Sequence, residues 1–88
     1  MRIYTFNGWC NISGDKIRTC RINEGMSQDQ FAARLQVEGL RLGQKQISRI
    51  ENRERVLADF ELKIIARVLG LSTDDLLSEE STDKGWYL

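Results

Sequence analysis

The sequence predicts an all-α protein built from five short helices, and three observations support this fold class. Apolar residues recur at the three- and four-residue spacing of one helix face from about residue 15 onward. Two segments start with a Ser that is followed three residues later by Gln or Asp, which is the pattern of a capping box. Glycines also follow several of the apolar segments as natural helix ends.

The first helix is expected over residues 15–24, with Gly25 as its end. Ile17 and Cys20 are expected to face the core, which makes Cys20 a small packing residue rather than a reactive thiol. Three basic side chains of this helix are expected in solvent: Lys16, Arg18 and Arg21.

The second helix has the clearest start. Ser27 is the expected N-cap, and Gln30 completes the capping box. Met26 and Phe31 flank this pair as a hydrophobic staple. The buried face is expected to consist of Phe31, Ala32 and Leu35. Residues 36–43 contain two glycines and are expected to form a turn.

The third helix is expected over residues 44–52, with Ile47 and Ile50 facing inward. Leu42 is expected to pack just before it. Because Gly43 stands where a Ser or Thr cap is favoured, this helix is expected to start less firmly than the second.

The last two helices carry further start and stop signals. The fourth is expected to begin near Asp59 as its N-cap and to end at Gly70. Its inward side chains are expected to be Leu62, Ile65, Ala66 and Leu69. Ser72 and Asp75 are expected to form the capping box of the fifth helix. The staple of that helix is expected to consist of Leu71 and Leu76.

The charges are balanced overall but unevenly distributed. The chain has 13 Lys and Arg residues against 13 Asp and Glu residues, a balance that alone would argue against a nucleic-acid partner. Residues 1–58 hold ten basic and six acidic residues, whereas residues 59–88 hold three and seven. One face can therefore be basic enough to meet phosphates while the acidic side chains lie elsewhere.

The composition disfavours several classes of protein. With two Cys and no His, we expect no metal site and no cofactor. No apolar run is long enough to span a membrane and no signal peptide is evident, so a cytoplasmic protein without membrane partners is expected. The carboxylate cluster consists of Asp74, Asp75, Glu79 and Glu80. Helix capping and solubility explain this cluster better than catalysis, so we expect no catalytic residues and no enzyme activity.

The third helix has an outward face with the chemistry that DNA reading requires. At about 100° per residue, the side chains that fall largely outward are Gln44, Lys45, Ser48, Arg49 and Asn52. Lys and Arg donate to guanine O6 and N7, Gln pairs with adenine, and Ser or Asn binds phosphate oxygens. A basic strip also recurs every four residues around this helix, at Arg41, Lys45, Arg49 and Arg53. Glu51 and Glu54 are expected toward its flank.

Taken alone, this face fits an ordinary solvated helix as well as a DNA-reading one. The context decides, because two short helices joined by a turn, with a further helix ahead of them, are how a helix-turn-helix presents its recognition element. The segments that carry a family resemblance are residues 14–18 (GDKIR), 25–28 (GMSQ), 47–52 (ISRIEN), 59–70 and 71–77 (LSTDDLL). In this order they resemble the phage repressor and Cro type of helix-turn-helix protein, the XRE family, over about residues 12–77.

The resemblance implies a five-helix lambda-repressor-like DNA-binding domain over residues 12–77, with an N-terminal arm at 1–11 and a C-terminal tail at 78–88. The residues that it implies for base edges are Gln44, Lys45 and Arg49. The residues that it implies for DNA phosphates are Gln28, Gln46, Ser48, Asn52 and Arg53. Gln28, the first residue of the second helix, is also expected to steady the recognition helix.

The turn before the third helix departs from the family pattern. Eleven residues separate Leu35 from Ile47, several more than the commonest family spacing, so residues 37–43 are expected to form an enlarged turn. The family pattern therefore does not fix the tilt of the third helix.

Two functions fit these features. The first is a dimeric regulator of transcription, a repressor, that binds double-stranded DNA at a pseudo-palindromic operator. The alternative is the antitoxin half of a toxin–antitoxin pair, a module that holds a protein partner and also binds DNA. A homodimer is expected because so short a chain gains by covering further apolar area, with contacts after Gly70 and at the aromatic ends. Those ends, at Tyr4, Phe6, Trp9, Trp86 and Tyr87, are expected to form short extended pieces.

Overall fold

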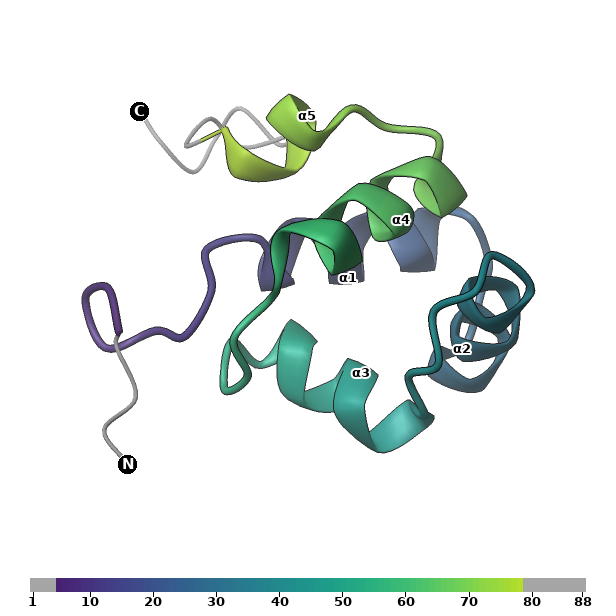
Figure 1. Cartoon of the computed structure of the whole chain (residues 1–88), viewed down its shortest axis with the longest axis horizontal. Helices are drawn as coiled ribbons and strands as arrows, with labels where there is room; N and C mark the ends of the chain where they lie inside the picture. Colours follow the sequence, from purple (N-terminus) through teal and green to yellow (C-terminus); the bar gives the residue numbers. More distant parts are fainter. Residues whose placement is uncertain (1–4, 79–88) are drawn as a thin grey trace.

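The computed structural model describes residues 5–78, which form five helices and, apart from one isolated bridge, no β-structure. The helices are α1 (Gly14–Asn23), α2 (Gln28–Val37), α3 (Gln44–Glu51), α4 (Asp59–Leu69) and α5 (Thr73–Leu77). In Figure 1, α4 crosses in front of α1. Helix α2 lies to the right, α3 lies below, and α5 covers the upper side. The predicted all-α class and five-helix order are confirmed.

One hydrophobic core joins all five helices. Its fully buried side chains include Ile17, Phe31, Leu35, Ile47, Ile50, Ile65 and Leu76. Cys20 packs against this cluster, and burial, followed by the charges of Asp75 and Glu24, raises the pKa of its thiol. The interpretation of Cys20 as a packing residue is therefore supported. Among the described residues, no helix has the length and apolar character to cross a membrane.

Two helices start with the predicted capping boxes. The Ser27 hydroxyl accepts the Gln30 N–H at 3.1 Å, and the Ser27 N–H donates to Gln30 Oε1 at 2.8 Å. Ser72 and Asp75 make the same reciprocal pair at 3.1 and 2.9 Å. Each pair satisfies two backbone donors that a helix start leaves without an intrahelical acceptor.

The starts of α3 and α4 lack a side-chain cap from the N-cap residue, and the N-cap predicted for α4 was wrong. Gly43 has no side chain to cap α3, but its N–H donates to Gln46 Oε1 at 3.0 Å, which is half of a capping box. The N-cap of α4 is Ala58 rather than Asp59, which is the first residue of the helix. Glu61 accepts the Ala58 N–H at 2.9 Å, so a residue inside the helix satisfies a donor at its start.

Three charged residues expected at the surface are buried. Arg21 and Glu51 are 7% and 3% exposed and form an ion pair between α1 and α3, so the solvent and flank placements predicted for them were wrong. Lys16 is also buried, and its ammonium group donates to the Ser78 carbonyl. Each side chain finds its partner on a distant part of the chain, and periodicity within one helix does not reveal such a partner.

The described part of the N-terminal arm forms a tight turn rather than an extended piece. Phe6 and Trp9 exchange two backbone hydrogen bonds of 2.9 Å each. Asn7 and Gly8 between them have φ angles of 53° and 85°, as a type I′ turn requires. This turn projects to the left in Figure 1. Residues 2–4 of the extended piece predicted over 2–9, and the whole piece predicted over 85–88, lie outside the described residues.

Candidate nucleic-acid interface

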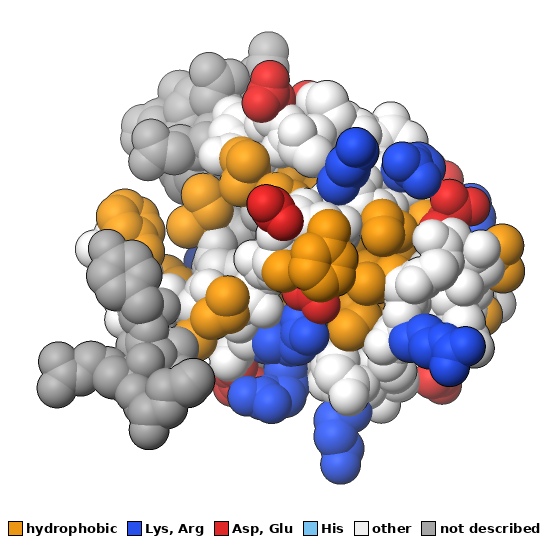
Figure 2. Space-filling view, in the orientation of Figure 1, with side chains coloured by type: hydrophobic (Ala, Val, Ile, Leu, Met, Phe, Trp, Pro, Cys, Tyr) orange, Lys and Arg blue, Asp and Glu red, His pale blue; other side chains and the backbone are white. Residues whose placement is uncertain are grey.

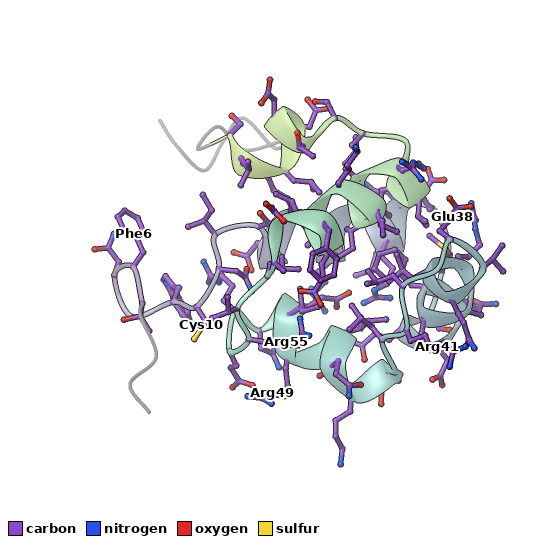
Figure 3. The ribbon with its side chains drawn as sticks, viewed as in Figure 1. Phe6, Cys10, Glu38, Arg41, Arg49 and Arg55 are labelled. Atoms are coloured by element: carbon purple, nitrogen blue, oxygen red, sulfur yellow. The ribbon has the colours of Figure 1, made fainter. Side chains whose placement is uncertain are left out.

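The outward face of α3 carries the side chains that the sequence predicts for DNA. Ile47 and Ile50 are each 1% exposed and anchor the helix in the core. On the opposite side, the exposed residues are Gln44, Lys45, Gln46 and Arg49. Blue side chains project at the lower edge of Figure 2, where Figure 1 places α3, and Figure 3 labels Arg49 among them. The structure thus brings the three predicted base-contacting residues to one side of one helix.

The enlarged turn holds α3 through two apolar anchors. Leu40 and Leu42 are 6% and 8% exposed and belong to the core cluster. The Leu40 N–H also donates to the Leu35 carbonyl at 2.9 Å, which closes the end of α2. The enlarged turn is therefore anchored in the core at Leu40 and Leu42, just before α3 begins. These two anchors hold the start of α3 in place despite the longer turn.

A side-chain hydrogen bond joins the starts of α2 and α3. Gln44 Nε2 donates to Gln28 Oε1 at 2.6 Å. Gln28 Nε2 in turn donates to Glu51 Oε1 at 3.0 Å. Because a carboxylate can accept but not donate, the NH2 group of Gln28 must face Glu51, and its oxygen must face Gln44. The orientation of both amide groups is thereby fixed from the interior.

The buried Arg21–Glu51 ion pair holds the carboxylate that accepts from Gln28. Arg21 Nε and Nη2 donate to the two Glu51 oxygens at 2.7 and 3.0 Å, and Nη1 donates to the Met26 carbonyl at 2.7 Å. A buried ion pair is stable when its geometry is good and its remaining groups are satisfied, as they are here. It ties α1 to α3 directly beneath Gln28, the residue predicted to meet a phosphate.

The other predicted phosphate-contacting residues differ in their surroundings. Gln46 uses its side-chain oxygen at the N-cap, so its NH2 group is the part that suits a phosphate. Ser48 is half-buried, whereas Asn52 is exposed. Arg53 follows the helix, with its guanidinium 3.4 Å from Asp15 and stacked on the Trp9 ring at 3.8 Å.

The N-terminal end of α1 packs against the C-terminal end of α3. Asn11 Nδ2 donates to the carbonyls of Ile50 and Arg55 at 3.1 and 2.8 Å, and Asn11 Oδ1 accepts the N–H groups of Ser13 and Gly14. A Cβ at Gly14 would lie 2.3 Å from the Ile50 carbonyl oxygen, closer than any real Cβ contact. Glycine is therefore required here for close approach of the two helices.

A second ion pair orders the segment that leads from α3 to α4. Arg55 Nη1 and Nη2 each donate to a Glu61 carboxylate oxygen at 3.0 Å. Burial alone would raise the pKa of Glu61, but the hydrogen bonds from Arg55 and the Ala58 N–H outweigh it and hold this pKa below its ordinary value. The Arg55 guanidinium therefore has a structural role in its pair with Glu61.

Sequence reasoning missed the supporting residues, although some left a signal. Arg21 follows Ile17 by four residues, and Glu51 follows Ile47 by four, so both charges share the core face of their helices. Two opposite charges at core positions indicate a buried pair. Asn7-Gly8 is a strong turn dipeptide that also went unused. The role of Asn11 has no comparable local signal, because both of its carbonyl partners lie more than 35 residues away.

Comparisons with known proteins agree with this architecture. A family model described as Helix-turn-helix matches residues 17–76. A solved structure, titled as a hypothetical transcription factor NHTF from Neisseria, is similar with a TM-score of 0.67 and 21% sequence identity. The similarity covers 88% of this chain and 83% of that chain, and at this identity it concerns the fold. No curated protein sequence matches the chain.

Proposed function

We propose a sequence-reading function for this chain, which belongs to the XRE-type family of helix-turn-helix DNA-binding transcription regulators. In this proposal, α3 reads a pseudo-palindromic operator and the bound protein represses transcription. One observation carries the reading mechanism: the start of α3 presents a pre-oriented amide beside two exposed basic side chains. The recognition helix of a helix-turn-helix contacts base edges with its N-terminal residues.

Gln44 is the base-reading residue whose geometry the interior fixes. Its Nε2 already gives one hydrogen to Gln28, so the second hydrogen and Oε1 remain available as a donor and an acceptor. That combination pairs with N7 and N6 of adenine in the major groove. Lys45 and Arg49 are exposed on the same helix and suit the O6 and N7 acceptors of guanine.

Gln28 is proposed to bind a phosphate beside the reading face. Its oxygen accepts from Gln44 and one N–H is held by Glu51, which leaves the second N–H for a phosphate oxygen. Such a contact positions the protein without reading the sequence. The same amide therefore links the DNA backbone to the orientation of Gln44.

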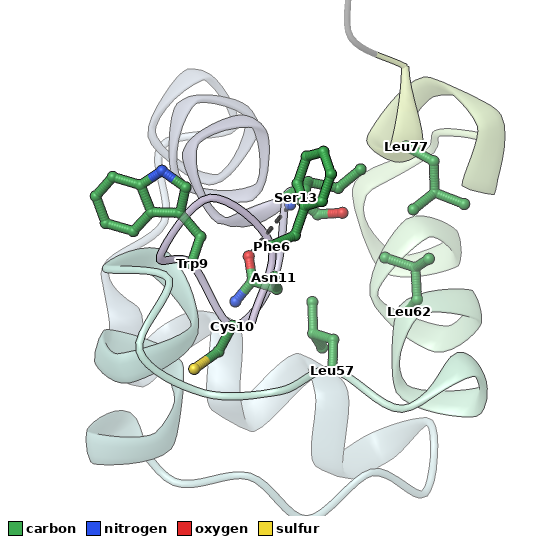
Figure 4. A pocket seen from close by; sticks show the side chains of 9 residues that line it. Phe6, Trp9, Cys10, Asn11, Ser13, Leu57, Leu62 and Leu77 are labelled. Carbon is green, nitrogen blue, oxygen red and sulfur yellow. Dashed lines mark hydrogen bonds between the residues drawn. The ribbon is translucent and has the colours of Figure 1, made fainter. Parts of the chain in front are cut away.

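The operator is proposed to be bound by a two-fold dimer. A groove between the N-terminal arm and the α4–α5 end is lined by apolar side chains that include Leu57, Leu62 and Leu77. In Figure 4 these leucines line one side of the groove and Phe6 lies across from them, while Trp9 lies on the other side of the arm. Phe6, Ile12 and Leu77 are 61%, 45% and 44% exposed. A second copy that covers this surface removes apolar area from water, which stabilises the assembly.

Selection of bound sequences from random duplex DNA tests the reading proposal. We expect a recovered sequence with two related half-sites whose centres lie about 10 base pairs apart. A transcription assay on a promoter that carries this sequence then tests repression. Recovery of no preferred sequence would contradict sequence-specific reading, and an increase in transcript would contradict repression.

Sedimentation of the Leu77→Asp variant tests the dimer surface. We expect the wild type to form dimers at high micromolar concentration and on the selected DNA, and Leu77→Asp to remain monomeric in both. Val37→Asp is the matched control, because Val37 is 84% exposed on α2, away from the groove. A wild type that binds DNA as a monomer would remove the dimer proposal. The antitoxin hypothesis, in which a protein partner covers this surface, would remain as the alternative.

A further inference from the structure

The residue that ends α3 adopts a backbone conformation that favours glycine. Three other helices are followed by glycines in the left-handed region, namely Gly25, Gly39 and Gly70, with φ angles of 73°, 93° and 71°. After α3 the corresponding residue is Arg53, with φ 61°. Its N–H donates to the Ile50 carbonyl, and the Glu54 N–H donates to the Arg49 carbonyl, as in a Schellman cap. A side chain in this conformation costs stability relative to glycine, and such strained residues are often found at functional sites.

The Arg53 side chain is held by the N-terminal arm. Its guanidinium lies 3.8 Å from the centre of the Trp9 ring, within the range of a cation–π contact. The arm itself is fixed to the end of α3, because the Cys10 N–H donates to the Arg53 carbonyl at 3.0 Å and the Asn11 side chain donates to the Ile50 carbonyl. Trp9 is therefore a fixed surface on which the guanidinium rests, rather than a free aromatic side chain.

Asp15 pairs with Arg53 in a way that an anion can displace. Asp15 Oδ2 lies 3.4 Å from Arg53 Nη2, longer than a good charge-assisted hydrogen bond. The Asp15 side chain is 67% exposed, so water and salt screen this pair. Stacking on Trp9 occupies a face of the guanidinium and leaves its edge donors for a carboxylate or a phosphate.

We infer that Trp9 is a positioning residue for DNA binding: its ring holds the Arg53 guanidinium at the end of α3, ready for a backbone phosphate that replaces Asp15. This inference rests on the proposed function, since it needs α3 to lie against duplex DNA. It adds the N-terminal arm to the DNA-binding machinery and assigns Asp15 as the competitor of the phosphate.

Arg53→Gly separates this role from a structural one. If Arg53 served the fold alone, glycine at this position would change stability and DNA binding together. The inference predicts that Arg53→Gly keeps or raises the thermal midpoint, since glycine relieves the left-handed backbone. It also predicts an affinity loss of about tenfold on any duplex, as expected for one charge-assisted phosphate contact. The slope of log affinity against log salt falls by about one.

The arm variants test whether Trp9 acts through Arg53. Binding is measured by fluorescence anisotropy on mixed-sequence duplex DNA over a salt series. Trp9→Ala is expected to weaken binding about two- to fivefold, the size of an exposed cation–π contact, and Trp9→Phe is expected to restore part of that loss. Asp15→Asn is expected to strengthen binding by up to about fivefold, because the competing carboxylate is removed. Arg67→Gln, which removes a positive charge from α4, is the charge control and should change affinity less than Arg53→Gly.

A double-variant cycle decides the inference. In the Arg53→Gly background, Trp9→Ala should have no further effect on affinity. An equal loss in both backgrounds would overturn it, because Trp9 would then act independently of Arg53. Unchanged affinity and salt slope in Arg53→Gly, alongside weakened binding of Arg49→Ala to the selected duplex, would overturn the inference and leave the proposed function standing. A wild type that binds no duplex at all would overturn both.

Discussion

The buried Arg21–Glu51 pair makes a quantitative prediction about stability. The two side chains are 9% and 1% exposed, so removal of either partner leaves a charge without compensation in the interior. Glu51→Leu and Arg21→Met are each expected to lower the free energy of unfolding by about 3–5 kcal/mol. A chain of 88 residues has a total stability of about 4–13 kcal/mol, so either variant loses a large fraction of it. The thermal midpoint should fall by at least about 12 °C.

The double variant Arg21→Met/Glu51→Leu provides the decisive comparison. Because it leaves neither charge buried, it should be more stable than either single variant in urea denaturation. The exposed Arg67–Glu38 pair is the control: its atoms are 3.6 Å apart and its side chains are 59% and 37% exposed, so Arg67→Met should cost less than about 1 kcal/mol. Single variants as mild as that control, or a double variant whose loss equals the sum of the singles, would refute the reasoning.

Three further predictions concern the fold around the interface. Ser27→Ala should lower stability by about 1 kcal/mol through loss of the α2 cap, and an unchanged denaturation midpoint would contradict that role. Gly14→Ala should lower the free energy of unfolding by about 1–3 kcal/mol, because the new Cβ would lie 2.3 Å from the Ile50 carbonyl oxygen. A thermal midpoint equal to that of the wild type would show that α1 and α3 can move apart without cost. The pKa of Glu61 is lowered in the folded state by its pairing with Arg55. The stability that this pairing contributes is therefore complete at pH values above the ordinary Glu pKa of about 4.3, and it is lost as the pH falls through the pKa of Glu61 in the folded protein. Glu61→Gln should therefore be less stable than the wild type at neutral pH and lose less stability on acidification; parallel acid curves for the two proteins would contradict this.

The helices could be predicted from the sequence because their ends are set by local interactions. Ser27 with Gln30 and Ser72 with Asp75 need no information beyond three residues, and both boxes form as predicted. The α4 start shows the limit of this reasoning. Asp59 is a favoured capping residue, but Glu61 satisfies the start of the helix from within it, so Ala58 takes the N-cap position.

The support behind the reading face could not be predicted in the same way. Arg21 and Glu51 are 30 residues apart, so their core-face positions hint at burial but do not show that the two side chains meet. The stack of Arg53 on Trp9 likewise depends on where the arm returns to the end of α3. Outward side chains follow from helix periodicity, whereas the contacts that orient them depend on tertiary packing.

In the proposed complex, α3 reads base sequence while Gln28 positions the protein on the DNA backbone. The most direct test compares the affinities of Arg49→Ala and Gln28→Ala for the selected duplex and for a scrambled duplex of equal length. Arg49→Ala should lose about 1–3 kcal/mol on the selected duplex and little on the scrambled one, so its specificity ratio falls. Gln28→Ala should weaken binding to both duplexes because the phosphate contact is lost. Its ratio should fall less than that of Arg49→Ala, because Gln28 affects base reading only through the orientation of Gln44. An unchanged ratio in Arg49→Ala would contradict the assignment of α3 as the reading helix.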